Sequence, residues 1–145
     1  MFKSILIPTD GSERAEKSIS QGVALAKALN ARVVGFYAIP AYHLMTFSTE
    51  MIAGTPEEYE LDATLRGKKY LAKIEEAARA VGVPCESFQA TAAHPYEAII
   101  KAAESKNCDA IAMASHGRRG VQGMLLASQT NLVLTHSKIP VVVFR

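Results

Sequence analysis

The residues with the clearest chemical potential lie in one stretch near the end of the chain, residues 114–129, which reads ASHGRRGVQGMLLASQ. Its first ten residues contain three glycines and two arginines, a composition that leaves backbone N–H groups accessible and adds positive charge. A helix capped at Ser128 would add unpaired N–H donors over residues 128–131 and the positive end of its dipole. The stretch predicts an anion cradle, and an ordinary flexible surface loop followed by a capped helix explains it equally well.

His116 raises the question of nucleophilic catalysis, because it stands next to Ser115. A nucleophilic serine needs a base that is oriented by a third group, and the side chains of adjacent residues point apart more often than they meet. The other histidines, His43, His94 and His136, have no metal-ligand spacing. We therefore predict no catalytic residue and no histidine metal site.

Short apolar runs alternate with helical patterns along the chain, which predicts an α/β domain with an open parallel sheet and helices on both faces. Runs without alternation, such as ILI at residues 5–7, are typical of strands buried on both faces. The expected strands cover residues 3–8, 32–39, 85–91, 109–114 and 140–144. The expected helices run from the N-cap Ser12 to Asn30, from Pro56 to Gly82, onward from Pro95, and from the N-cap Ser128 to about His136.

The order of these elements predicts where a ligand would bind. In open α/β sheets, ligands lie at the carboxyl ends of strands beside the point where the strand order reverses. This rule directs attention to Pro8, Thr9 and Asp10 after the first strand and to residues 114–117 after the fourth. An aspartate in an Asp-Gly-Ser sequence also commonly forms a side-chain turn. The position of Asp10 at a strand end favours the interpretation as a site residue.

The composition limits the classes of protein to consider. A chain of 145 residues with 49% apolar and 21% charged residues fits one globular domain, and a net charge of +2 is too small to indicate nucleic acid as the main partner. The apolar stretch at the amino terminus is too short for a signal peptide, and the sequence has no run of about 18 apolar residues that would span a membrane. Cys85 and Cys108 stand in no CxxC spacing, which favours two reduced thiols. A cytoplasmic location follows by elimination.

Several segments together resemble the universal stress protein family over essentially the whole chain, residues 1–145. The segment ILIPTDGS (5–12) matches the first strand and turn of that family, and AMASHGRRG (112–120), LLAS (125–128) and IPVVVF (139–144) match its last third. The combination is specific, whereas each piece alone would be weak. The resemblance implies a single-domain, Rossmann-like fold of the adenine nucleotide alpha hydrolase type, with five parallel strands in the order 3-2-1-4-5.

ATP-binding members of that family carry a glycine, two residues, a glycine, nine residues, and then glycine followed by serine or threonine. The matching positions here are Ala114, Gly117, Ala127 and Ser128, so the spacing is kept while alanine replaces two of the three glycines. Each alanine would cost roughly 1–2 kcal/mol if its backbone were left-handed. With an ordinary backbone, the added methyl group would only narrow the pocket.

The resemblance also implies a set of nucleotide contacts. Asp10 would lie by the ribose or by a phosphate-bound Mg²⁺, the backbone of Ala38 would meet the adenine edge, and Ser128 and Gln129 would donate to the phosphates. The full set of expected contacts is Pro8, Thr9, Asp10, Ala38, Met113, Ala114, His116, Gly117, Arg118, Ala127, Ser128, Gln129 and Thr130.

The resemblance points to an ATP-binding regulator in the stress response, with at most slow hydrolysis. It also implies a homodimer through the last strand, Val141–Phe144, which as an uncovered edge would be an aggregation liability. The alternative function is a nucleotide-free dimer of the same fold that acts as a protein-interaction module, which the two alanines favour. An adenylating enzyme of a related fold would carry a phosphate loop rich in serine and glycine after the first strand, where this chain has PTDGS.

The stretch 41–55 is long for a loop and contains several apolar residues, among them Tyr42, Met45, Phe47 and Met51. Loops of this length are often lids or interaction surfaces. The same residues could instead begin a helix that packs on the domain's own core, and the sequence does not separate these interpretations.

Overall fold

The computed structural model describes residues 1–42, 54–115 and 126–145, the side chains of residues 126–128 excepted. Five parallel strands form one sheet in the order β3-β2-β1-β4-β5. This arrangement confirms the expected Rossmann-like sheet and its strand order. The strands are β1 (Ser4–Thr9), β2 (Arg32–Pro40), β3 (Cys85–Ala92), β4 (Ala110–Ala114) and β5 (Val141–Phe144).

Strand β1 lies at the centre of the sheet and is buried along its whole length, as its unbroken apolar sequence predicts. It pairs with β2 on one side, where Thr9 lies opposite Tyr37, and with β4 on the other, where Leu6 lies opposite Ile111. The chain moves outward from β1 through β2 to β3 and then crosses back to β4. The strand order therefore reverses between β1 and β4.

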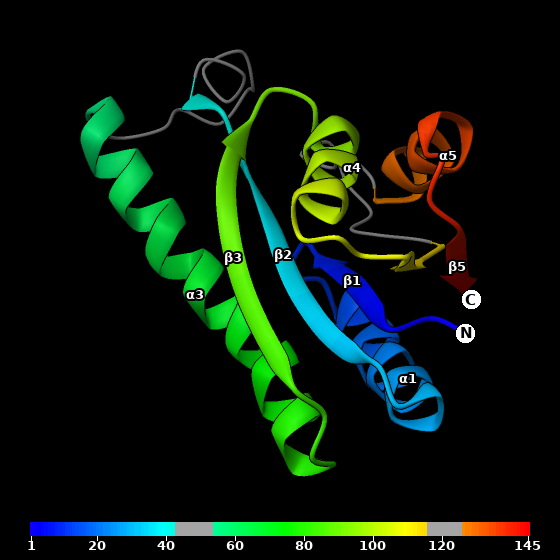
Figure 1. Cartoon of the computed structure of the whole chain (residues 1–145). Helices are drawn as coiled ribbons and strands as arrows, with labels where there is room; N and C mark the ends of the chain where they lie inside the picture. The colour runs from blue at the N-terminus through cyan, green and yellow to red at the C-terminus, as the bar shows by residue number, and fades with distance from the viewer. Residues whose placement is uncertain (43–53, 116–125) are drawn as a thin grey trace.

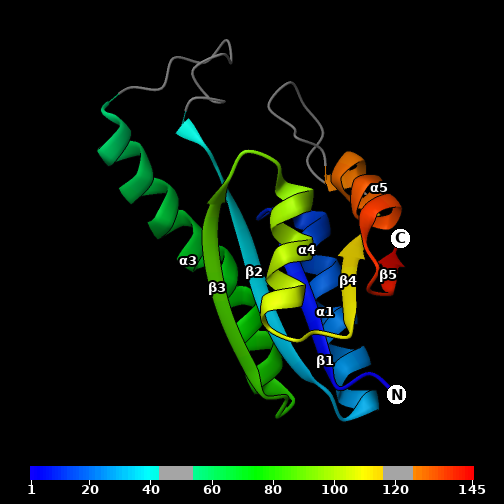
Figure 2. The ribbon, with the colours of Figure 1, turned by 45° about the horizontal axis from the view of Figure 1, so that its top comes forward.

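Two layers of helices cover the sheet (Figures 1 and 2). Helix α1 (Glu13–Leu29) lies over β1 and β4, and α3 (Pro56–Ala80) lies over β2 and β3 on the same face. Helices α4 (Pro95–Ser105) and α5 (Leu126–His136) cover the opposite face, α4 over β1, β2 and β3 and α5 over β4 and β5. Alternate residues of β1 consequently enter two different cores: Ile5 and Ile7 pack toward α1 and α3, whereas Leu6 packs toward α4.

The helix boundaries follow local capping chemistry. Ser12 caps α1 by accepting a hydrogen bond from the Ala15 N–H at 3.2 Å, and Asn30 ends the helix, both as predicted. The structure adds that Asn30 adopts a left-handed conformation. Helix α3 begins with Pro56 at its first position, also as predicted. The sequence reasoning did not identify its capping box, in which Thr55 and Glu58 satisfy each other's backbone N–H groups.

The prediction that Ser128 caps the last helix is wrong. Helix α5 spans Leu126–His136, so the backbone of Ser128 lies inside its first turn. Leucine and alanine are strong helix formers, and they carry the helix in front of the serine. The unpaired N–H donors consequently begin at Leu126 rather than at Ser128.

The expected fourth strand also began one residue too early, at Asp109. The strand starts at Ala110, and the Asp109 carboxylate instead accepts hydrogen bonds from the N–H groups of Lys3 and Ser4 at 2.9–3.1 Å. Asp109 therefore ties the start of β4 to the start of β1. The remaining strands differ from their expected bounds by a single residue at one or both ends.

Candidate functional site

The carboxyl end of β1 is a tight, self-bonded turn. The Thr9 hydroxyl oxygen accepts a hydrogen bond from the Gly11 N–H at 3.1 Å, and Asp10 Oδ1 accepts one from the Ser12 N–H at 2.9 Å. Asp10 therefore forms the side-chain turn that its sequence context suggested. Its second oxygen, Oδ2, accepts no hydrogen bond from the described residues, so it is open to a ligand or a cation.

Gly11 is required in this turn for two reasons. Its φ of 77° lies in the left-handed region, and a Cβ at this position would overlap Cζ of Tyr70. Tyr70 in turn packs edge-on against Tyr37, with ring centroids 5.3 Å apart. The Tyr70 ring of helix α3 thus packs against the turn after β1 and holds it in place. The sequence does not predict this contact.

The carboxyl end of β4 lies beside that of β1. Met113 and Ala114 are buried there, and the Ser115 N–H donates to the Phe144 carbonyl at 2.7 Å, which joins the end of β4 to the end of β5. The Thr130 hydroxyl of α5 donates to the Ala114 carbonyl at 2.8 Å. This hydrogen bond fixes the first turns of α5 against the strand end.

Gln129 makes a second anchor for α5. Its Oε1 accepts a hydrogen bond from the Tyr96 N–H at 2.9 Å, in the first turn of α4. The N-cap of α4, His94, provides no side-chain hydrogen bond, and Pro95 has no N–H, so Gln129 satisfies a donor that α4 itself leaves unpaired. The Gln129 side chain is buried and ties two helices together, while its backbone N–H remains in the first turns of α5.

The structure brings the described part of the predicted site to one edge of the sheet. Pro8, Thr9 and Asp10 end β1, and Met113 and Ala114 end β4. Ala38 is half-buried in β2, one residue beyond the partner of Thr9. Gln129 and Thr130 lie in α5, with the backbones of Ala127 and Ser128 just before them. The predicted contacts His116, Gly117 and Arg118, and most of the 41–55 loop, lie outside the described residues.

Asp10 is the only ionisable side chain among the candidate residues that the structure describes. Burial raises the pKa of the Cys85 thiol to about 11 and also raises the pKa of the Cys108 thiol, so both remain protonated at neutral pH and are poor nucleophiles.

Within residues 1–42, 54–115 and 126–145, no cluster of three or more histidine, cysteine, aspartate or glutamate side chains could hold a metal ion. No helix in the same ranges is long and apolar enough to cross a membrane.

The arrangement combines three kinds of group at the reversal point of the sheet. It offers a carboxylate with one oxygen that accepts no hydrogen bond from the described residues, a half-buried strand edge at Ala38, and the amino-terminal turn of α5, whose N–H groups and positive dipole favour an anion. Groups of this kind can bind a ligand that has a flat polar edge at one end and negative charge at the other.

Comparison with known proteins gives a consistent result. The family model described as "Universal stress protein family" matches residues 1–145. A universal stress protein of Thermus aquaticus is 32% identical over 148 residues, an alignment that covers all of both chains.

Solved structures share the fold. A universal stress protein in complex with cAMP superposes with a TM-score of 0.72 at 20% identity, covering 99% of this chain and 97% of the other. One from Archaeoglobus fulgidus in complex with dAMP gives 0.68 at 17% identity, covering 99% and 98%.

Proposed function

Because this chain belongs to the universal stress protein family, we propose that it is an adenine-nucleotide-binding regulatory protein of the stress response. The observation that carries the proposal is the meeting of β1, β4 and α5 at the point where the strand order reverses. There the Thr130 hydroxyl holds the first turns of α5 within hydrogen-bond distance of the β4 end, and β4 pairs directly with β1. A helix start fixed beside two strand ends is a common way of binding the phosphates of a nucleotide.

The backbones at the two alanines are compatible with this function. Ala114 belongs to strand β4, and Ala127 belongs to helix α5. Strand and helix backbones both have negative φ, so an alanine at these positions carries none of the cost of a left-handed residue. Replacement of the two motif glycines by alanine then changes the shape of the pocket but adds no backbone strain.

The solved relatives support an adenine nucleotide as the ligand class. One universal stress protein is in complex with cAMP and another with dAMP, and both have the fold of this chain. Among adenylates we propose ATP with Mg²⁺, because the free Oδ2 of Asp10 can approach a metal ion bound to the phosphates. The phosphates would lie at the amino-terminal turn of α5, and the adenine edge would meet the backbone of Ala38.

A regulatory role fits the described site better than rapid turnover. Hydrolysis requires a base positioned beside the phosphates. Asp10 is the only ionisable candidate in the described ranges, and one of its oxygens is already held by the Ser12 N–H. We therefore propose slow hydrolysis at most, with the bound nucleotide acting as a signal. A cytoplasmic location stays a prediction.

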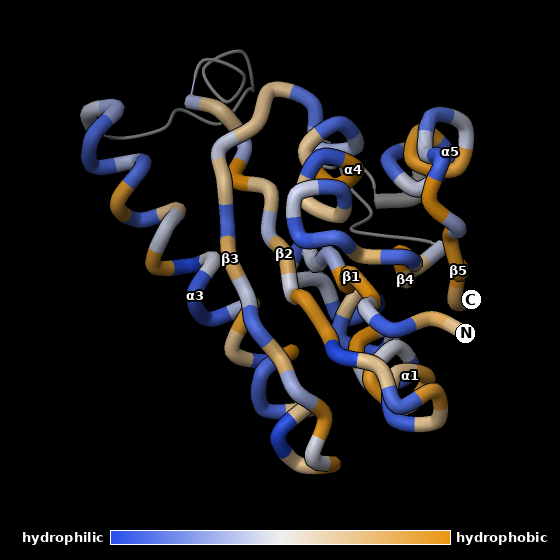
Figure 3. The backbone as a smooth tube through the Cα atoms, in the orientation of Figure 1, coloured by the Kyte–Doolittle hydropathy of each residue, from blue (hydrophilic) through white to orange (hydrophobic). Residues whose placement is uncertain are grey.

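We also propose a homodimer formed through β5. This strand has four apolar residues, all only partly buried, at an edge of the sheet. Figure 3 shows β5 in the hydrophobic colours, whereas β3 at the other edge is mixed and contains the charged residue Glu86. An apolar edge without charged residues is suited to pairing with a second copy.

The experiment that tests nucleotide binding is calorimetric titration of the purified protein with ATP, with and without Mg²⁺. The chain has no tryptophan, so adenine that copurifies with the protein would be visible in its ultraviolet spectrum. Asp10→Asn is the informative variant, because the amide oxygen can still accept from Ser12 while the negative charge is lost. We expect Asp10→Asn to weaken binding of Mg²⁺-ATP by about tenfold and to leave the affinity for metal-free ATP unchanged.

Absence of bound adenine together with absence of saturable heat would contradict the proposal. In that case the second candidate function, a nucleotide-free dimer that works through protein partners, would be favoured by the apolar β5 edge. If the Asp10→Asn variant binds Mg²⁺-ATP as tightly as the wild type, then Asp10 does not contact the metal ion and serves only to form the turn.

A further inference from the structure

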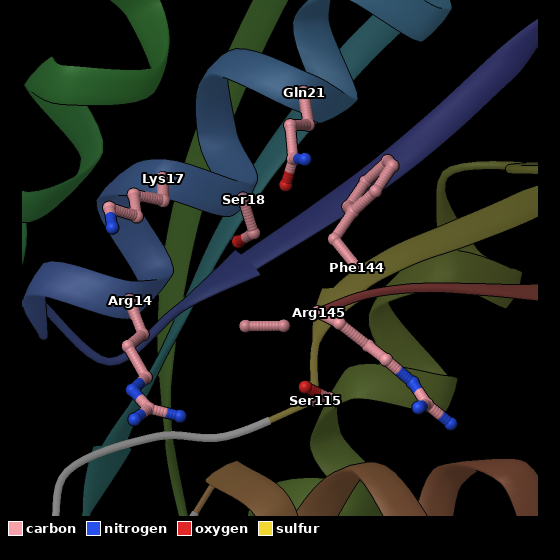
Figure 4. Close-up of a pocket in the computed structure, with 8 residues that line it drawn as sticks. Arg14, Lys17, Ser18, Gln21, Ser115, Phe144 and Arg145 are labelled. Carbon is pink, nitrogen blue, oxygen red and sulfur yellow. The ribbon is translucent and has the colours of Figure 1, made fainter.

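A separate pocket lies on the α1 face of the sheet, near the carboxyl ends of β4 and β5 (Figure 4). One wall is a single side of α1 that presents Arg14, Lys17, Ser18 and Gln21, and the other wall is formed by the ends of the two strands. Arg145 and Ser115 lie across from α1, and Phe144 and Ala114 provide the apolar surface. None of the α1 residues belongs to the nucleotide contacts proposed above.

The charged side chains that line this pocket are all of one sign. Three of its lining side chains are cationic, and no lining residue is acidic. Among the described residues, the charged groups of Arg14, Lys17 and Arg145 have no hydrogen-bond or ion-pair partner. The cations at the opposite end of the sheet differ: Arg32 and Lys106 both pair with Glu86, at 2.8 and 3.3 Å, and these hydrogen bonds lower the pKa of that carboxyl group.

The position of one of these cations is electrostatically unfavourable without a ligand. Arg14 lies in the first turn of α1, where the positive end of the helix dipole repels a cation. The Lys17 and Arg145 side chains are exposed and extend in different directions in Figure 4, so water screens the repulsion between them. A bound anion would convert the unfavourable position of Arg14 into an attraction.

The size and donors of the pocket indicate which anion fits. Its volume of about 200 Å³ is below the range of roughly 300–1,000 Å³ typical of sites for whole small-molecule ligands. A guanidinium group can donate two parallel hydrogen bonds to the oxygens of one phosphate, and the Gln21 amide adds a neutral donor. Three positive charges match the multiple charge of a phosphate group better than the single charge of a carboxylate.

We propose that this pocket, formed by Arg14, Lys17, Gln21, Ser115, Phe144 and Arg145, binds a phosphate-bearing anion the size of phosphate or pyrophosphate. The anion can come from two sources that share this chemistry. It can be a free inorganic anion, or it can be the distal phosphates of a nucleotide bound at the strand ends, since Ala114 at the end of β4 belongs to both sites. The second source rests on the proposed function, whereas the first does not.

The test is calorimetric titration with inorganic pyrophosphate at low salt, comparing two double variants of equal charge. Arg14→Gln/Lys17→Gln removes two cations from the pocket. Lys68→Gln/Lys69→Gln removes two exposed cations from α3 and controls for net charge. We expect the wild type and the α3 variant to bind pyrophosphate with saturation, and the pocket variant to bind at least about tenfold more weakly. All four substituted side chains are exposed, so we expect both variants to fold, and a thermal melt checks this.

Parallel titrations with AMP and ATP identify the source. If the pocket variant weakens ATP binding but not AMP binding, the pocket holds distal phosphates of the nucleotide; if it weakens neither, the pocket takes a free anion. Failure of AMP and ATP to bind the wild type would overturn the proposed function and leave the pyrophosphate result standing. The pocket proposal is overturned if the wild type shows no saturable pyrophosphate binding, or if the two double variants bind it equally.

Discussion

At the scale of single residues, the turn after β1 shows how side chains from distant parts of the chain fix a candidate site. Gly11 combines a left-handed backbone with a contact that leaves no room for a methyl group, because the Tyr70 ring covers it. Among the described residues, the side chains of the neighbouring Asp10 and Thr9 accept hydrogen bonds only from within the turn. The position of Asp10 therefore depends on Gly11 and, through it, on the packing of α3.

Substitution of Gly11 tests this dependence, and Gly82 provides a matched control. Both glycines have similar positive φ, 77° and 72°, but a Cβ at Gly82 would meet only Lys27 Nζ, at 4.0 Å. Gly82→Ala should lower the free energy of unfolding by about 1–2 kcal/mol through backbone strain alone. Gly11→Ala should cost at least about 1 kcal/mol more, because the methyl group must displace the Tyr70 ring from Tyr37.

Urea denaturation of the two variants measures this difference. The same Gly11→Ala substitution made in a Tyr70→Ala background should cost only as much as Gly82→Ala, since the ring is then absent. Equal losses for Gly11→Ala and Gly82→Ala in the wild-type background would show that the Tyr70 ring moves aside freely and does not hold the turn.

At this scale, the sequence predicts the structure best where the chemistry is local. The residue types of Ser12, Asn30 and Pro95 place them at helix ends, and the structure confirms each of them. The roles of Tyr70, Gln129 and Thr130 were not predicted, because each depends on a contact with a residue far away in the sequence. The spacing of Arg14 and Lys17 predicts that they share one face of a helix, but the sequence does not predict that the end of β5 lies opposite them.

At the scale of elements, α5 is the helix whose placement decides the candidate site. It is held by two side chains of neighbouring residues: Thr130 binds the end of β4, and Gln129 binds the start of α4. Both side chains are buried, with exposed fractions of 2% and 8%. The amino-terminal turn of α5 is thus set by polar contacts directly beside it, and not only by the apolar packing of Val133 further along.

Removal of the Thr130 hydroxyl tests the anchor. Thr130→Val keeps the shape of the side chain but leaves the buried Ala114 carbonyl without this donor, and we expect a loss of about 1–2 kcal/mol in the free energy of unfolding. Thr130→Ser keeps the hydroxyl and loses a methyl group, so it should cost about 1 kcal/mol or less. Chemical denaturation ranks the two. A serine variant less stable than the valine variant would show that methyl packing, rather than the hydrogen bond, holds α5.

Element positions were predictable because the apolar pattern of this chain is regular. Each strand was expected within about one residue of its bounds, since strand-forming runs are separated by Gly, Pro or Asn at the turns. The error at the start of α5 arose because Ser128 has the chemistry of an N-cap but follows two strong helix formers. A residue type can indicate that a helix start is near, whereas the competition among neighbouring residues decides where the helix begins.

At the scale of the whole molecule, the two edges of the sheet have different character. Strand β3 is long and polar at one edge, and β5 is short and apolar at the other. Two proposed features lie at or beside the β5 edge: the dimer contact and the anion pocket, to which Phe144 contributes. The proposed nucleotide site lies further inward, at β1 and β4. The proposed ligand sites and the proposed dimer contact therefore lie on the same half of the sheet.

The backbone of β5 determines how a second copy could pair with it. The carbonyls of Pro140 and Phe144 accept hydrogen bonds from β4, at 2.9 and 2.7 Å. Residues of a strand alternate in the direction of their backbone polar groups, so Val142 also faces β4, whereas Val141 and Val143 present their N–H and C=O groups to the open edge. A two-fold axis that pairs this strand with itself makes the pair antiparallel, and the sheet then continues from one copy into the other.

A proline at position 143 consequently separates dimerisation from folding. Val143→Pro removes an N–H that faces the open edge and leaves the hydrogen bonds to β4 intact, a position where an edge strand tolerates proline. We expect sedimentation equilibrium to show a dimer for the wild type and for the control Val143→Thr, which keeps the N–H, and a monomer for a folded Val143→Pro variant. A wild type that is monomeric, or a proline variant that remains dimeric, would exclude pairing through β5. In the second case another surface would have to join the copies, because a strand that lacks this donor has lost half of the polar groups that Val143 offers to a partner.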